Sequence, residues 1–242
     1  MRSVLSSNPV LPTISPLASR SIQNLGGGHE TQISEVDRLD STACRTISLE
    51  NTVPDFVELP TDLPVPVDDG AAAHLVGAEL PDLILPATDG TSTRTADVGE
   101  GRTVIYFYPL TGRPGTDLPE GWDSIPGARG CTTEACDFRD HHEDLRGLGV
   151  GAVYGISSQS TEYQAEVAAR LRLTFTMLSD ERFRFAEALN LPTFRAPGHD
   201  RLYSRLTLIV RDGRIEHVFY PIFPPNTHAQ QVVAWLRENP SA

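Results

Sequence analysis

The sequence predicts a three-layer α/β domain built on a mixed β-sheet, preceded by a long extension without a core of its own. Strand-like and helix-like segments alternate from Gly77 onward. Several of the strand-like segments are apolar runs of the kind found in buried strands. The last two are joined by Asp212-Gly213, the strongest short hairpin signal. Strands that alternate with helices and end in a hairpin give a sheet of mixed direction.

The predicted elements follow one another along the chain. Apolar and β-branched runs predict strands at 81–86, 103–108, 150–157, 174–178, 205–211 and 214–220. Apolar residues three and four apart predict helices after Cys131, at 163–171 behind the N-capping Ser160, at 181–189 and at 227–237. In the first helix the shared face is formed by Ala135, Phe138, His142 and Leu145. Residues 109–130, rich in Gly and Pro, are expected to form a long loop.

Residues 1–73 are expected to form a disordered or weakly ordered N-terminal extension, and residues 74–242 a single domain. Phe56 is the only aromatic residue of the extension, which carries ten acidic residues against four Arg. Such a segment cannot bury enough apolar area to offset the entropy of ordering it. The remaining length lies within the usual range for one domain.

Charge and cysteine content exclude several classes of protein. The chain has 20 Lys+Arg and 32 Asp+Glu, and a net charge of -12 argues against binding the phosphate backbone of nucleic acids. Three cysteines are too few and too oddly numbered for a secreted disulfide framework. No run of about 18 apolar residues is available to span a membrane. We therefore expect a cytoplasmic protein with neither nucleic acid nor a membrane as partner.

Two cysteines lie where the Gly-rich loop becomes a helix. The amides and the dipole at the helix start favour a thiolate at Cys131 and a lowered pKa, which the acidic Glu134 opposes slightly. In an intact helix the Cα atoms of Cys131 and Cys136 are about 8.6 Å apart, whereas a disulfide requires less than about 7 Å. A bond between them thus requires the first turns to unwind. The spacing alone fits a redox pair and a pair of buried structural cysteines equally well.

A metal site is not expected here. Cys131, Cys136, His141 and His142 do not converge on one point when they lie on a single helix. The two histidines are expected at the helix surface and at the edge of the core.

The segment GCTTEACDFRD at 130–140, preceded by TVIYFYP, resembles the active site of peroxiredoxins of the bacterioferritin comigratory protein subgroup, also called PrxQ. GAELPDLILPATDG, VYGISSQSTEYQAEVAARLRLTFTMLSDE and RLTLIVRDGRIEHVF resemble further segments of the family in the same order. The resemblance covers roughly residues 74–240. It implies a thioredoxin-like fold, with helices flanking the mixed sheet. It also implies a thiol-dependent peroxidase, without a cofactor, that reduces hydrogen peroxide or organic hydroperoxides.

The resemblance also implies roles for single residues. Cys131 matches the peroxidatic cysteine that becomes a sulfenic acid, and Cys136 the resolving cysteine that closes an intramolecular disulfide. Arg205 matches the arginine that faces the thiolate, where a guanidinium lowers the thiol pKa and donates hydrogen bonds to the peroxide. Pro109 and Gly130 complete the expected substrate site. A thioredoxin-like dithiol protein resets the family's enzymes, and we expect a monomer or a weak homodimer.

One departure from the family pattern concerns a hydroxyl group. The pattern Pro-x-x-x-Thr-x-x-Cys places a Thr three residues before the cysteine, but Ala128 stands three before Cys131, and the cysteine follows Pro109 only after an insertion. We expect Thr111 to supply the hydroxyl, with Thr116 as the other candidate and a site without a hydroxyl as the third alternative.

The inserted residues 110–130 leave several interpretations open. With an exposed Trp122, they are expected to shape the substrate pocket, to dock a partner, or to be a tolerated loop that Trp122 pins down. Arg195 is expected to be a solvated loop charge, with a place in the same pocket as the alternative. Cys44 is expected to be inert, with an intermolecular disulfide as the alternative.

Two other functions stay open at this point. The first is a thiol-disulfide oxidoreductase of the same fold, kept open by the displaced Thr. The second is a non-catalytic redox sensor or partner-binding module that uses the Trp122 loop and the acidic extension.

Overall fold

The structure is a computed structural model, which describes residues 58–98 and 101–240. Its central sheet has five strands in the order β5-β4-β3-β8-β9. They are β3 (Arg102–Phe107), β4 (Val150–Ser157), β5 (Thr176–Ser179), β8 (Leu206–Arg211) and β9 (Arg214–Phe219). Strands β3, β4 and β5 run parallel, β8 pairs antiparallel with β3, and β9 pairs antiparallel with β8. The predicted mixed sheet with its terminal hairpin is confirmed. Cys44 lies outside the described residues.

The other elements surround this sheet. Two small hairpins pair β1 (Ile84–Pro86) with β2 (Ser92–Arg94), and β6 (Thr193–Ala196) with β7 (His199–Tyr203). The helices are α1 (Cys131–Asp140), α2 (His142–Gly147), α3 (Thr161–Leu171), α4 (Arg184–Leu189) and α5 (His228–Glu238), with short 3-10 turns at Thr95–Asp97, Trp122–Ser124 and Pro225–Thr227. Within the described ranges, no helix has the length and apolar character needed to cross a membrane.

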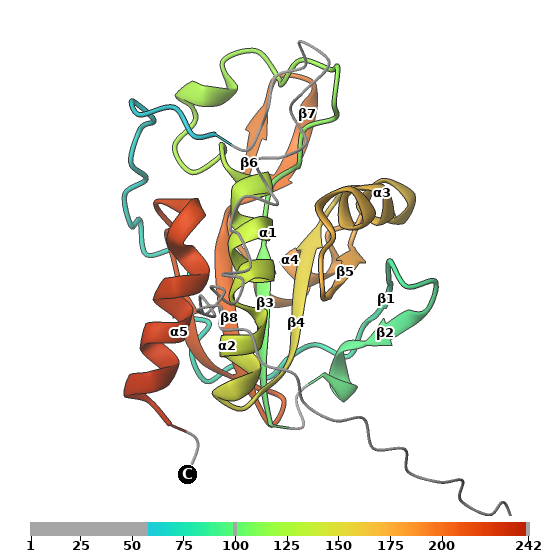
Figure 1. Ribbon diagram of the computed structural model, residues 1–242, viewed down its shortest axis with the longest axis vertical. Helices are drawn as coiled ribbons and strands as arrows, with labels where there is room; N and C mark the ends of the chain where they lie inside the picture. Colours follow the sequence, from blue (N-terminus) through green and yellow to red (C-terminus); the bar gives the residue numbers. More distant parts are fainter. Residues whose placement is uncertain (1–57, 99–100, 241–242) are drawn as a thin grey trace, which may run out of the picture. The chain divides into compact units, whose positions relative to one another are not determined.

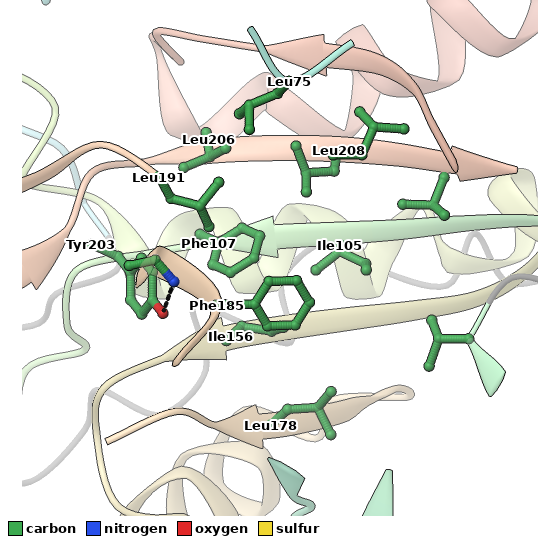
Figure 2. Close-up of a cluster of buried hydrophobic side chains, with 14 of the residues drawn as sticks. Leu75, Ile105, Phe107, Ile156, Leu178, Phe185, Leu191, Tyr203, Leu206 and Leu208 are labelled. Atoms are coloured by element: carbon green, nitrogen blue, oxygen red, sulfur yellow. Dashed lines mark hydrogen bonds between the residues drawn. The ribbon is translucent and has the colours of Figure 1, made fainter. Parts of the chain in front are cut away.

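Successive side chains of β3 point to opposite faces of the sheet, so the strand contributes to two hydrophobic cores, one on each face. On one face α1, α2 and α5 cover the sheet (Figure 1), and Tyr106 stacks on Phe138 with ring centroids 4.6 Å apart. On the other face, Figure 2 shows Ile105 and Phe107 packed among side chains from α4, β4 and β8. The reactive segment begins on the first of these faces, because Cys131 belongs to the same cluster as Tyr106.

Three local features differ from the expectation. The helix expected after Cys131 is interrupted at His141, so it becomes α1 and α2, and His142 starts the second helix rather than continuing the first. The β6–β7 hairpin was not expected, because residues 191–203 lack the apolar alternation of a strand pair. Arg195 is therefore on a strand, and its side chain is exposed as expected.

Packed structure starts before residue 74. Ala72 and Leu75 are buried in the same core cluster as Leu206 and Leu208 of β8. Pro66 and Val67 line a small hollow beside Arg205. Small and apolar residues make this packing possible without aromatic side chains. Residues 58–73, which the sequence assigns to the extension, thus cover part of the domain.

Candidate active site

The site begins at Cys131, the first residue of α1. Gly130 caps this helix with a φ of 104°, a left-handed conformation that glycine adopts without strain. A Cβ atom at this position would also collide with the ring of Pro225. Gly130 therefore allows the loop to approach the 3-10 turn Pro225–Thr227 closely and to turn directly into the helix at Cys131. Cys131 is a free and buried thiol.

Strand pairing brings Arg205 to this thiol. In the antiparallel register of β3 and β8, Phe107 faces Leu206. Arg205, one residue before Leu206, consequently lies beside the end of β3, where the chain leaves through Tyr108 and the buried Pro109. The carbonyl groups of residues 127–129 then fix the guanidinium, which donates to Gly127, Ala128 and Arg129.

The guanidinium of Arg205 contacts the reactive sulfur directly. Its Nη2 donates to Sγ of Cys131 at 3.2 Å, and the thiol faces the carbonyl oxygen of Ala128 at 3.7 Å. Its Nη1 forms an ion pair with Glu134. The side chains of Arg205 and Glu134 are 1% and 0% exposed, so the pair is shielded from solvent. A cation held in a dry site stabilises negative charge on sulfur or oxygen far more than one in water.

Glu134 was expected only as a helix-start acid that slightly opposes the thiolate, and the structure adds its ion pair with Arg205. Its position three residues after Cys131 places both side chains on the same face of α1, and this spacing is the sequence signal that identifies it. One carboxylate oxygen pairs with Arg205, and the other has no hydrogen-bond partner within the described part of the chain. Burial raises the pKa of Glu134 to about 7, although Arg205 acts in the opposite direction.

Burial also raises the pKa of the Cys131 thiol above its ordinary value, and Glu134 adds to this effect. Arg205 and a hydrogen bond from the backbone of Leu110 lower the pKa but do not outweigh burial. The pKa of Cys131 is thus raised in this buried site, where a lowered pKa was expected. The sequence argument considered the helix start and the arginine but could not include the loss of solvent around the sulfur.

Cys136 lies on the side of α1 that faces α3. It packs in a small cluster with Tyr163, Val167 and Leu171 of α3. Helix α1 is continuous from Cys131 to Asp140, so Cys131 and Cys136 are held about 8.6 Å apart at their Cα atoms. The two sulfurs meet only when the start of α1 unwinds, as the spacing predicts.

The structure assigns the hydroxyl of Thr111 to another partner. Both the backbone N–H and the Oγ1 of Thr111 donate to Oε1 of Gln159, each at 2.9 Å. The Thr111 and Gly112 carbonyl oxygens accept from the hydroxyl of Tyr163. The loop after β3 is thus tied to α3. Thr116 is exposed. Neither candidate shows a hydrogen bond to Cys131.

We predict that Thr111→Val changes the rate of the reaction with hydrogen peroxide by less than about threefold. The backbone N–H of Thr111 keeps its bond to Gln159, and one neutral hydrogen bond contributes only about 1 kcal/mol to stability. Stopped-flow measurement of the fully reduced variant at pH 7 checks this. A loss of a hundredfold or more in a folded variant would instead assign the hydroxyl to the reaction.

The insertion is anchored through Trp122. Its side chain was expected to be exposed, but it is buried, with only 3% of its surface exposed. Trp122 packs with Leu110, Ala128 and Leu202, and its ring lies 6.1 Å from that of Phe194. These partners come from the missed β6–β7 hairpin and from the loop itself. The insertion is therefore packed against the rest of the domain, and Leu118 and Trp122 line the cavity next to Cys131.

The two histidines of the region have structural contacts. His141 contacts Asp137 of the preceding turn, and His142 pairs with Thr174. Asp137 in turn accepts from the backbone N–H of Ala229 at the start of α5. The contacts of Asp137 connect α1 to α5, and no hydrogen bond or ion pair joins either histidine to the sulfur of Cys131 within the described residues.

Comparison with known proteins identifies this arrangement. The redoxin family model matches residues 75–233. Peroxiredoxin Bcp of Escherichia coli K12 is 33% identical over 162 residues, covering 66% of this chain and 93% of that protein. The chain belongs to the redoxin family, among the peroxiredoxins of the Bcp/PrxQ group. It is accordingly a thiol peroxidase, and a disulfide mechanism is typical of this family.

More distant relatives agree with this assignment. Chloroplastic peroxiredoxin Q of Gentiana triflora is 26% identical over 188 residues, and the match covers 75% of this chain and 78% of the Gentiana protein. The crystal structure of peroxidoxin BcpB from Mycobacterium tuberculosis has a TM-score of 0.55 and 27% identity, covering 69% of this chain and all of the other. The expected thioredoxin-like fold is thus confirmed.

Proposed function

We propose that Cys131 is the peroxidatic cysteine of this peroxiredoxin and that Arg205 activates it. The observation that carries the proposal is the 3.2 Å contact between Nη2 of Arg205 and Sγ of Cys131 at the start of α1. A donor at this distance stabilises the thiolate and, in the transition state, the negative charge that develops on the peroxide oxygens.

The reaction then proceeds through one oxidation by the hydroperoxide and one condensation that releases water. The Cys131 thiolate attacks the terminal oxygen of a hydroperoxide, the O–O bond breaks, and water or an alcohol leaves after taking up a proton. Cys131 becomes a sulfenic acid. After α1 unwinds, the Cys136 thiolate attacks the Cys131 sulfur, water leaves, and a disulfide forms.

A dithiol protein of the thioredoxin type completes the cycle by thiol-disulfide exchange, in which the reductant is oxidised and both cysteines return to thiols. The protein acts as a monomer or a weak homodimer in the cytoplasm. Pro109 and Gly130 serve the site through the backbone, by ending β3 and by starting α1.

Burial of the sulfur favours a peroxidase over a thiol-disulfide oxidoreductase. Cys131 is 4% exposed, and the cavity against it has a volume of about 10 Å³. A cavity of this size accommodates about one water-sized group. A hydroperoxide end fits such a space, whereas a protein disulfide does not reach the sulfur while α1 is folded.

The test is a single turnover of the fully reduced protein. Cys136→Ser is expected to consume one equivalent of hydrogen peroxide and to keep a sulfenic acid at Cys131, detected as a dimedone adduct by mass spectrometry. Turnover with thioredoxin and its reductase falls at least about a hundredfold. Full turnover of Cys136→Ser would reject Cys136 as the resolving residue.

A further inference from the structure

Two adjoining hollows lie along the insertion. The small cavity of about 10 Å³ touches Cys131, and its walls include Leu118 and Trp122. An outer hollow of about 400 Å³ is lined by residues 117–124 and by Arg129. The two share Leu118, Trp122 and Arg129 as lining residues. The insertion thus builds both the wall beside the sulfur and the hollow outside that wall.

The two sizes assign different parts of a substrate to the two spaces. The inner cavity accommodates about one water-sized group, so it fits only the O–O end of a hydroperoxide. The outer hollow lies in the range of small-molecule pockets, which begins at about 300 Å³. The organic part of an alkyl hydroperoxide would occupy this outer space, against the half-buried side chains of Leu118 and Pro119.

The outer hollow has an excess of negative charge. Asp117, Glu120 and Asp123 face one cation, Arg129, and Arg129 is tied to Asp123 at 3.2 Å. Asp117 and Glu120 are exposed at the rim. A substrate that carries a carboxylate would meet repulsion here at short range, and salt would screen that repulsion.

We infer that hydroperoxides reach Cys131 through this outer hollow, and that Asp117 and Glu120 select uncharged hydroperoxides against those that carry a carboxylate. The inference rests on the proposed role of Cys131. The described residues form another hollow beside Arg205, of about 60 Å³ and lined in part by Pro66, Val67 and Pro126, but Cys131 is not among its lining residues.

The test compares two substrates that differ in a single charge, cumene hydroperoxide and its para-carboxylate. Rate constants are measured by stopped flow with the fully reduced protein at low salt. We expect the carboxylate to react about fivefold more slowly, because two carboxylates lie near its path. The difference should fall below twofold in 1 M NaCl, where the screening length is about 3 Å.

Variants locate the effect. Asp117→Asn/Glu120→Gln should bring the two rate constants within twofold of each other and leave the rate with hydrogen peroxide unchanged. Asp117→Lys/Glu120→Lys should make the carboxylate the faster substrate. The matched control Glu143→Gln/Asp144→Asn changes two exposed acids of α2 by the same charge and should keep the wild-type ratio.

Each outcome bears on one claim. Equal rates for both substrates in the wild type, or equal shifts in the rim and control variants, would overturn the inferred route and selectivity. Absence of reaction with every peroxide, or reaction that survives Cys131→Ser, would instead overturn the proposed role of Cys131. Circular dichroism of the rim variants, whose substituted side chains are exposed, checks that they are folded.

Discussion

Arg205→Met is expected to slow the reaction of the reduced protein with hydrogen peroxide by about 10² to 10³ at pH 7. Removing one preorganised donor to a developing anion costs this much in other enzymes. Here the donor lies 3.2 Å from the sulfur in a buried site. The rate is measured by stopped flow, with peroxide in excess.

A loss of folding must be separated from this loss of rate. Arg205→Met leaves Glu134 buried without its cation, and breaking a buried ion pair costs about 3–5 kcal/mol of stability. The double variant Glu134→Gln/Arg205→Met removes the unpaired acid and should recover much of the free energy of unfolding, measured in urea. Its rate should stay low. A double variant that recovers the rate as well would show that Arg205 acts only through folding.

Glu134→Gln is expected to flatten the dependence of stability on pH. The pKa of Glu134 is raised from its usual 4.5 to about 7, so the folded protein holds this proton at a pH where the unfolded chain has released it. The resulting stability is complete below about pH 4.5 and is lost as the pH rises through about 7. In the wild type this loss amounts to at most about 3 kcal/mol.

The measurement is urea unfolding at a series of pH values between 4.5 and 8. The free energy of unfolding of the wild type should fall as the pH rises over this range. Glu134→Gln should remove the part of this fall that is due to Glu134. The control Glu143→Gln, which changes an exposed acid of α2, should show the same fall as the wild type. A decline of the same size in Glu134→Gln would mean that Glu134 is ionised throughout the range in the folded protein.

Local sequence signals were sufficient for most of the sheet. Strand β4 has the predicted bounds, because VGAVYGIS is an apolar run that Gly149 precedes. Ser160 caps α3 as expected, accepting from the N–H of Tyr163. Each of these signals depends on neighbouring residues only. Strand β4 is part of the central sheet, and α3 packs against that sheet.

Contacts between distant segments were not predictable in this way. Trp122 is buried because Phe194 and Leu202, from a hairpin with weak strand signals, pack against the insertion. The hydroxyl of Thr111 is used by Gln159, 48 residues away. The family resemblance placed Cys131 and Arg205 together, but it could not specify how deeply the sulfur is buried or how Glu134 completes the site.

The peroxidatic role of Cys131 is tested by the consumption of hydrogen peroxide by the fully reduced wild type and by Cys131→Ser, followed by stopped flow at pH 7. We expect rapid consumption by the wild type, with one sulfenic acid formed at Cys131, and a rate at least about 10³-fold lower in the variant. Consumption by Cys131→Ser at the wild-type rate would contradict this role.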